Sequence, residues 1–208
     1  MVRVSWHDAR GFCDFLTQAW LDLLPKDFLV TLPSEAEWEK AARGGDRIPA
    51  NYEWVTVHQL AEKRETLLCC PQMANPFRTR AYLWGESFGS DKANAESTID
   101  ETSAVGCYPT GLSPYGCEEM SGNVWEWTRS LWGKDWEKPD FAYPYDPDDR
   151  KRENLDAGND EKRVVRGGSW NLSLDLARCA FRYRVPPDAR YFPLGFRVVL
   201  RSSPIPEL

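Results

Sequence analysis

The sequence lacks an excess of positive charge, a long apolar run and the pattern of an export signal. Its 26 Lys and Arg face 32 Asp and Glu, for a formal net charge of −6, which argues against nucleic acid or an anionic membrane as the main partner. No stretch approaches about 18 apolar residues, so no transmembrane helix is predicted. Residues 1–10 lack the tripartite pattern of a secretory signal, so we expect a cytoplasmic protein unless a preceding region directs export.

The fingerprints of common enzyme classes are missing as well. We find no P-loop, no dinucleotide-binding glycine pattern and no serine-triad motif. The cysteines suit neither a zinc site nor a disulfide framework, because the chain is long and shows no export signal. We therefore expect reduced and mostly buried thiols at Cys13, Cys69, Cys70, Cys107, Cys117 and Cys179.

Aromatic residues are present in unusual number. There are 10 Trp, 8 Tyr and 9 Phe beside 15 Pro and 14 Gly in 208 residues. Large aromatic side chains fill space between loops, and Pro and Gly interrupt regular elements. The length suits one domain, or at most two small ones, and the composition predicts a loop-rich fold.

The clearest regular elements are two early helices. Ser5 is placed to cap a helix that runs from residue 6 into the low twenties, with apolar positions at helical spacing. A capping box, Ser34 to Glu37, begins a second helix that the pair Gly44–Gly45 ends. A third helix is predicted within 54–68. Strands are predicted over 163–166, 180–185 and 196–200, so the pattern indicates an α+β fold with a small antiparallel sheet built mostly late.

Six ordered strings resemble those of one family. They are VSWHDA at 4–9, LPSEAEWE at 32–39, AARGG at 41–45, GNVWEWT at 122–128, RVVRGGSW at 163–170 and LGFRVV at 194–199. Together they resemble the formylglycine-generating-enzyme, or sulfatase-modifying-factor, domain. The resemblance implies one domain over residues 1–208 with a modified C-type lectin fold and little regular secondary structure. Residues 46–79 then read as an insertion, and the N-terminal part of the family domain is expected to be missing.

The residues that the family uses for catalysis are not matched. Family oxidases bind copper through a cysteine pair that follows the string ending at Trp170. Here residues 170–178 contain no cysteine and Cys179 stands alone, and one thiolate cannot supply the two-sulfur site that a cuprous ion prefers. A related sulfoxide synthase of ergothioneine biosynthesis uses iron-binding histidines, whereas this sequence has only His7 and His58. The resemblance therefore implies a protein that is not an enzyme and has no catalytic residue.

The C-terminal stretch, residues 171–199, resembles the variable region of proteins made by diversity-generating retroelements. In those systems a template RNA is copied with errors at adenines, so diversified positions carry residues with N-N-pyrimidine codons. None of the twelve candidate positions is Lys, Glu, Gln, Met or Trp, which such codons cannot encode; chance would give this roughly one time in fifteen. These candidate ligand-binding positions are Leu172, Ser173, Leu174, Leu176, Phe181, Tyr183, Val185, Pro186, Ala189, Tyr191, Phe192 and Pro193.

The residues alone leave two interpretations of this stretch. Phe181, Tyr183 and Val185 alternate with Arg182 and Arg184, so one face of a strand is apolar and the other is charged. Either the apolar face enters the core, or the arginines hold the scaffold and the apolar face is exposed. The resemblance favours the second interpretation, and residues 191–193 suit a recognition loop, where rigid aromatics give contact area at low entropic cost.

The resemblance thus implies a monomeric, non-enzymatic protein that binds a diversified ligand, which we expect to be another protein. No nucleic acid or membrane partner is expected. The alternative is a formylglycine-generating-type oxidase, or an accessory modification factor that has lost or relocated its metal. That alternative requires a narrow cleft that converges on Cys179.

We expect that the protein requires no cofactor, and calcium is the one candidate. Asn123, Val124 and Glu126 bring a side-chain amide, backbone carbonyls and a carboxylate into one short string, and oxygen donors of this kind suit a hard cation. Family members often carry calcium near the matching string. The alternative is that Asn123 and Glu126 hydrogen-bond to neighbouring loops.

Overall fold

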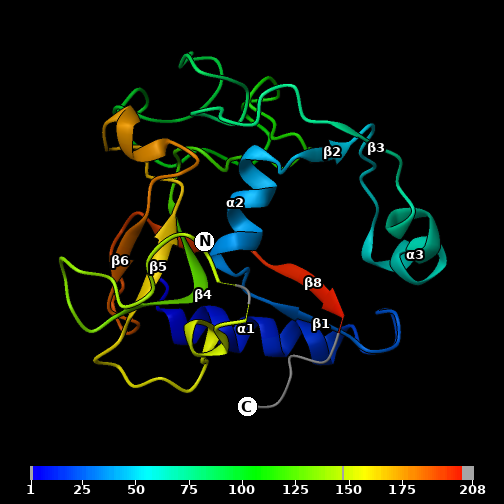
Figure 1. Ribbon diagram of the computed structural model, residues 1–208, viewed down its shortest axis with the longest axis horizontal. Coiled ribbons are helices and arrows are strands. Elements are labelled where there is room, and N and C mark those ends of the chain that lie inside the picture. The colour runs from blue at the N-terminus through cyan, green and yellow to red at the C-terminus, as the bar shows by residue number, and fades with distance from the viewer. Residues whose placement is uncertain (1, 147, 203–208) are drawn as a thin grey trace.

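The computed structural model describes residues 2–146 and 148–202, together with the side chains of all of these except 67 and 68. The fold is α+β, as the sequence predicts. Residues 75–124 contain no helix or strand beyond a single bridge between Tyr82 and Gly85, and these long loops form the upper part of the molecule in Figure 1. Among the described residues, no helix combines the length and apolar character needed to cross a bilayer.

Both early helices begin at capping boxes. In α1 (Trp6–Ala19) the Ser5 hydroxyl accepts from the backbone N–H of Asp8, whose carboxylate accepts from the backbone N–H of Ser5 at 2.8 Å. In α2 (Glu35–Arg43) Ser34 and Glu37 make the same exchange, and Gly44 follows with φ of 78°. A left-handed φ of this kind is one that glycine adopts without strain. The predicted starts of both helices and the end of α2 are confirmed.

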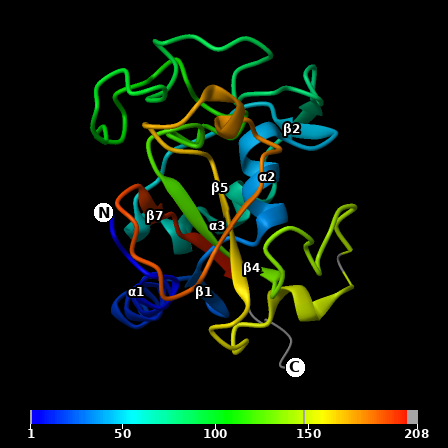
Figure 2. The same cartoon turned by 90° about the vertical axis from the view of Figure 1, so that its left-hand side faces the viewer.

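A four-stranded sheet with the order β6-β5-β4-β7 forms the centre of the fold. The long strand β4 (Trp125–Gly133) pairs antiparallel with β5 (Lys162–Arg166), which pairs antiparallel with β6 (Tyr183–Val185). On its other side, β4 pairs in parallel with β7 (Leu194–Phe196). Figure 2 shows β4 and β5 side by side in this sheet. A separate antiparallel pair joins β1 (Phe28–Thr31) to β8 (Val199–Ser202).

The strand predictions need four corrections. The predicted strand over 180–185 shortens to β6, and the one over 196–200 divides into β7 and β8, because the chain leaves β4 at residue 196 to pair with β1. The β4–β7 pair is parallel, so the sheet is mixed and not wholly antiparallel. The sequence also missed β4, which is buried along its whole length although it contains Glu126, Thr128, Arg129 and Ser130. A fully buried strand is expected to be a nearly continuous apolar run, so this composition does not reveal it.

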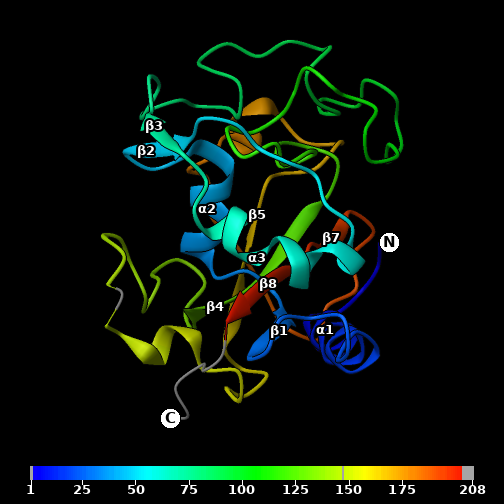
Figure 3. The ribbon, with the colours of Figure 1, turned by 90° about the vertical axis from the view of Figure 1, so that its right-hand side faces the viewer.

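Residues 46–79 leave and rejoin the domain at neighbouring points. β2 (Arg47–Pro49) and β3 (Gln72–Ala74) pair antiparallel, and the backbone N–H of Asn75 donates to the carbonyl of Asp46 at 2.9 Å. Between them lie a short 3-10 helix, η1 (Val57–Gln59), and α3 (Leu60–Leu68). The third helix therefore starts later than residue 54. Figure 3 shows α3 on the side that carries β8, where the Arg64 guanidinium lies 5.3 Å from the ring centroid of Phe28.

A buried ion network ties α2 to the sheet and to the C-terminal third. The fully buried Arg166, at the end of β5, donates to Glu35 at 3.0 Å and to Glu39 at 2.8 Å, both on α2. It also donates to the carbonyl of Cys179 at 2.6 Å. Glu35, itself fully buried, accepts from Arg182 at 2.8 Å as well. Buried charges are tolerated only when paired in this way.

We predict that Glu35→Gln destabilises the fold by about 3–5 kcal/mol, because two buried guanidinium groups lose their shared carboxylate charge. Urea unfolding at neutral pH measures the loss. Glu62→Gln, on the exposed surface of α3, is the matched control and should change stability by less than about 0.5 kcal/mol. A loss for Glu35→Gln no larger than that of the control would contradict the prediction.

Candidate functional site

The segment after β5 is attached to the scaffold at several points. The backbone N–H of Cys179 donates to Ala81 at 2.7 Å, and the carbonyl of Pro187 accepts from Trp6 at 2.9 Å. Further along, Arg190 forms an ion pair with Asp8 at 2.7 Å. Figure 2 shows the segment, in orange, running from the short helix η3 (Leu174–Ala177) past the central sheet towards α1. Five candidate positions lie between these attachment points, and the others lie before Cys179 or directly after Arg190.

Most candidate positions retain solvent exposure. Tyr191 is 58% exposed, Phe192 40% and Tyr183 39%. Ser173 is also exposed, and the half-buried positions are Leu172, Leu174, Leu176, Phe181, Pro186, Ala189 and Pro193. Val185 is the exception and a correction to the predicted set: it is 3% exposed and belongs to the main hydrophobic cluster, because the side chains of β6 at that end turn into the core.

Two tryptophans from the fixed strings support the candidate aromatics. The ring of Trp125 stacks on Tyr183 at 5.5 Å between centroids and lies 6.0 Å from Phe181. Trp170 meets the ring of Phe192 edge-on at 6.2 Å. The two tryptophans are linked through the backbone. The N–H of Trp170 donates to the carbonyl of Asn123, two residues before Trp125, at 3.0 Å. Both tryptophans belong to strings that carry the family resemblance, and nothing in the sequence indicated that they contact the candidate positions.

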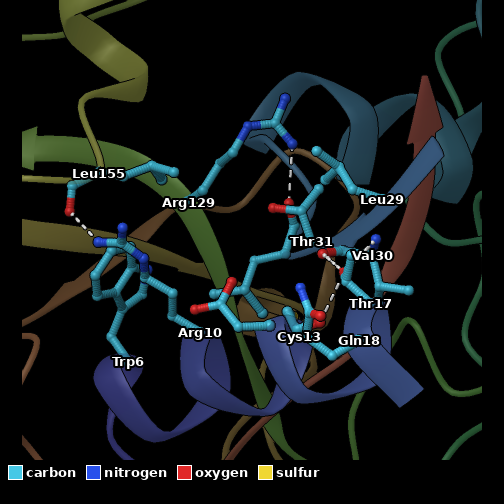
Figure 4. Close-up of a pocket in the computed structure, with 12 residues that line it drawn as sticks. Trp6, Arg10, Cys13, Thr17, Gln18, Leu29, Val30, Thr31, Arg129 and Leu155 are labelled. Atoms are coloured by element: carbon cyan, nitrogen blue, oxygen red, sulfur yellow. Dashed lines mark hydrogen bonds between the residues drawn. The ribbon is translucent and has the colours of Figure 1, made fainter. Parts of the chain in front are cut away.

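A pocket of about 270 Å³ lies elsewhere, between α1, β1 and β4 (Figure 4). Its lining includes Trp6, Arg10, Thr17, Val30 and Arg129 and none of the candidate positions. Two of the polar groups at its wall are paired internally: Thr17 accepts from the backbone N–H of Val30 at 2.9 Å, and Arg129 donates to the carbonyl of Leu32 at 2.9 Å. The pocket is therefore separate from the candidate binding surface.

Cys179 does not lie in an open cleft. It is fully buried beside Trp38 and Met120, and burial raises the pKa of its thiol to about 12. A thiol with that pKa is protonated and poorly reactive at neutral pH. Within residues 2–146 and 148–202, no three His, Cys, Asp or Glu side chains are grouped as metal ligands.

The six cysteines are all unpaired, but only Cys13 and Cys179 are buried. Cys69 and Cys107 are exposed, and Cys70 and Cys117 are half-buried. The expectation of mostly buried thiols is therefore wrong, because four of the six lie directly after α3 or on loops near the surface.

The three candidate calcium residues do not fit a calcium ion as they are arranged. The Asn123 side chain accepts from the N–H of Ser103 at 3.1 Å and donates to its carbonyl at 3.2 Å. The Glu126 carboxylate accepts from Arg197 at 2.5 and 2.6 Å and from the indole of Trp38 at 2.6 Å. Val124 supplies only a carbonyl. These contacts match the alternative in which Asn123 and Glu126 hold neighbouring loops, and we derive no role through calcium.

Glu119 is a buried carboxylate of this region to which no motif in the sequence pointed. Both of its side-chain oxygens are buried and lack a hydrogen-bond partner among the described residues. Burial, with the negative charge of Glu118 beside it, raises the pKa of Glu119 from an ordinary 4.5 to about 7. The folded protein therefore binds a proton here that the unfolded chain releases between pH 4.5 and 7.

We predict that this group makes the wild-type protein less stable as the pH rises from about 5 to 7, because the unfolded state binds fewer protons over that range. Glu119→Gln should remove the dependence and stabilise the protein at pH 8 by about 1–2 kcal/mol, after allowing for partial solvent screening. Thermal unfolding at several pH values measures this, with the exposed Glu101→Gln as control. Equal pH profiles for wild type and Glu119→Gln would rule the prediction out, and a calcium-dependent rise in Tm lost in Glu119→Gln would instead make Glu119 an ion ligand.

Comparison with known proteins places the chain in a family. Residues 1–202 match the sulfatase-modifying factor enzyme 1-like domain. The inactive C-alpha-formylglycine-generating enzyme 2 of Bos taurus is 32% identical over 203 residues, which is 95% of this chain and 48% of that protein. The hercynine oxygenase of Mycobacterium tuberculosis is 34% identical over 177 residues, 84% of this chain and 37% of that protein. The chain thus spans less than half the length of these relatives.

Solved structures with the same fold include Treponema denticola variable protein 1, with a TM-score of 0.56 and 22% identity over 98% of this chain and 71% of that one. PvdO from Pseudomonas aeruginosa has a TM-score of 0.55 and 21% identity, over 97% of this chain and 61% of that one. At these identities the likeness concerns the fold, a modified C-type lectin fold of the formylglycine-generating-enzyme type. The chain belongs to the sulfatase-modifying factor enzyme 1-like family.

Proposed function

We propose that the protein is a non-enzymatic ligand-binding protein whose residues 171–199 form a diversified surface, as in variable proteins of diversity-generating retroelements. The observation that carries the proposal is that some groups of this segment are bound to the scaffold while other side chains are exposed. Arg182 and the backbone of Cys179 are bound into the scaffold, whereas Tyr183, Tyr191 and Phe192 are exposed. Side chains can change at the exposed positions without disturbing the contacts that hold the segment.

The chemistry of the exposed side chains also supports binding. Tyrosine and phenylalanine provide rigid contact area at low entropic cost, which is why recognition surfaces are rich in them. Here the tryptophan platforms below Tyr183 and Phe192 limit the motion of both rings. The shared fold with Treponema denticola variable protein 1 is compatible with this role, and a protein is the partner that such a surface suits.

An enzymatic or accessory modifying role is the alternative, since a relative is named as an oxygenase. Another relative is named as inactive, and the burial of Cys179 favours the absence of the family's copper chemistry.

The alternative leads to a prediction about thiol accessibility. At pH 8, iodoacetamide should alkylate Cys69 and Cys107, which are exposed, and leave Cys13 and Cys179 unmodified until the protein is unfolded, because burial raises the pKa of both thiols to about 12. Peptide mass spectrometry reads each site separately. Alkylation of Cys179 in the folded protein as fast as that of Cys69 would favour the enzymatic alternative.

The binding proposal predicts that the exposed positions tolerate diversification. A displayed library with N-N-pyrimidine codons at Ser173, Tyr183, Tyr191 and Phe192 should stay folded and yield binders to a test protein such as hen lysozyme. The matched library diversifies Phe12, Phe15 and Leu21, which are also exposed but lie on or just after α1, and should yield none. Binders from both libraries at similar frequency, or from neither, would count against a dedicated surface.

The gene neighbourhood gives an independent test. The proposal expects a nearby copy of the codons for residues 171–199 that differs almost only at adenines, beside a reverse transcriptase gene. Sequencing that finds no such copy and no such gene would count against diversification.

A further inference from the structure

Arg184 is held among aromatic rings at the edge of the proposed binding surface. It lies at the centre of β6, the outermost strand of the sheet, opposite Val164 of β5. The carbon of its guanidinium is 5.0 Å from the ring centroid of Tyr183, 5.2 Å from that of Trp132 and 5.8 Å from that of Trp136. Aromatic faces attract a guanidinium and limit its movement, so the group is positioned before any ligand arrives.

Among the described residues, Arg184 makes no side-chain hydrogen bond and no ion pair. Its Nε is buried without a partner, and its terminal nitrogens have none of the contacts that its neighbours make. Arg182 is bound to Glu35, Arg178 lies 3.8 Å from Asp175, and Arg190 lies 2.7 Å from Asp8. Of these four arginines of the C-terminal segment, Arg184 alone lacks a carboxylate.

A second cation increases the local positive charge. Lys162, at the start of β5, is 7% exposed, and its ammonium lies 4.6 Å from the ring centroid of the same Trp136. It donates to the carbonyl of Lys134 and forms no ion pair among the described residues. Among the described residues, both cations lie against one indole with no carboxylate within ion-pair distance. Asp135 and Asp160 interact with the charge of Lys162 at longer range, so Arg184 is the cation that an incoming anion would neutralise.

We infer that Arg184 is a fixed anion anchor of the binding surface, that is, a guanidinium that donates hydrogen bonds to an aspartate or glutamate side chain of a protein ligand. This inference rests on the proposed function, because it takes the surface beside Tyr183 to be the one that meets the ligand. Rings pack around the guanidinium and Nε is buried, so the terminal Nη1 and Nη2 are the donors left for a ligand. Two parallel N–H groups match the two oxygens of a planar carboxylate. Arg184, Trp132 and Trp136 lie outside the diversified set, so the guanidinium and two of its three rings stay constant when Tyr183 varies.

The anchor can be tested without knowing the ligand. N-acetyl-aspartate N-methylamide is titrated into ¹⁵N-labelled protein while the Arg184 Nε–H and the Trp136 indole N–H are followed by NMR. Saturable shifts of both signals are expected, with none for the neutral N-acetyl-asparagine N-methylamide. In Arg184→Gln the Trp136 shift should disappear, and in the matched Arg178→Gln it should persist. No saturable shift in the wild type, or tighter binding of inorganic phosphate than of the carboxylate probe, would overturn the assignment.

A second measurement separates the anchor from the function. For binders taken from the library diversified around Tyr183, Arg184→Gln should weaken affinity about tenfold or more, the size expected for losing a charge-assisted hydrogen bond, whereas Arg178→Gln should not. Arg184→Lys keeps the charge on a comparable side chain and should weaken binding less. Binders that are indifferent to Arg184 would refute the anchor and leave the proposed function standing. NMR shifts at Arg184 with no binders from the library would support the anchor and refute the function.

Discussion

The structure depends on two buried carboxylates, Glu35 and Glu39, which bind arginines from distant parts of the chain. Arg166 ends β5 and Arg182 precedes β6, and both donate to Glu35. This places the C-terminal segment against α2 without help from regular secondary structure, of which the fold has little. Paired and hydrogen-bonded buried charges are demanding in geometry, so the network fixes the path of the chain between Cys179 and β6.

That constraint is compatible with the proposed function, in which the segment is held in place while its exposed side chains vary. Its main chain and its frame side chains are bound to the scaffold, and the tryptophans of the fixed strings lie below it. Several tryptophans, such as Trp6, Trp38 and Trp127, are almost completely buried, whereas Tyr183, Tyr191 and Phe192 of this segment are exposed. Aromatic rings also hold Arg184, which forms no ion pair with any residue that the structure describes.

Interactions between residues near in sequence made the helices predictable, but they did not reveal β4 or the pairing of β7 and β8. Capping boxes and the glycine after α2 are encoded within a few residues, so Ser5, Ser34 and Gly44 mark the helix ends directly. β4 is buried along its length although it contains several polar residues, so its composition does not indicate a buried strand. The division of 194–202 into β7 and β8 depends on partners far away in sequence. Similarly, the string at 122–128 suggested calcium ligands, but contacts with Ser103 and Arg197 occupy the same side-chain atoms.

The sequence by itself determined the family, the α+β class, the early helices, the absence of the family's cysteine pair and the interval that carries the candidate surface. Only the tertiary structure decided which side chains of that interval face water: Tyr191 and Phe192 are exposed, whereas Val185 is in the core. It alone decided that Cys179 is enclosed, that Glu126 is paired with Arg197, and that Arg184 has no carboxylate partner within residues 2–146 and 148–202. The physical reason is that burial and pairing of a side chain are set by neighbours brought together from the whole chain, whereas propensity, capping and motif spacing act within a few residues.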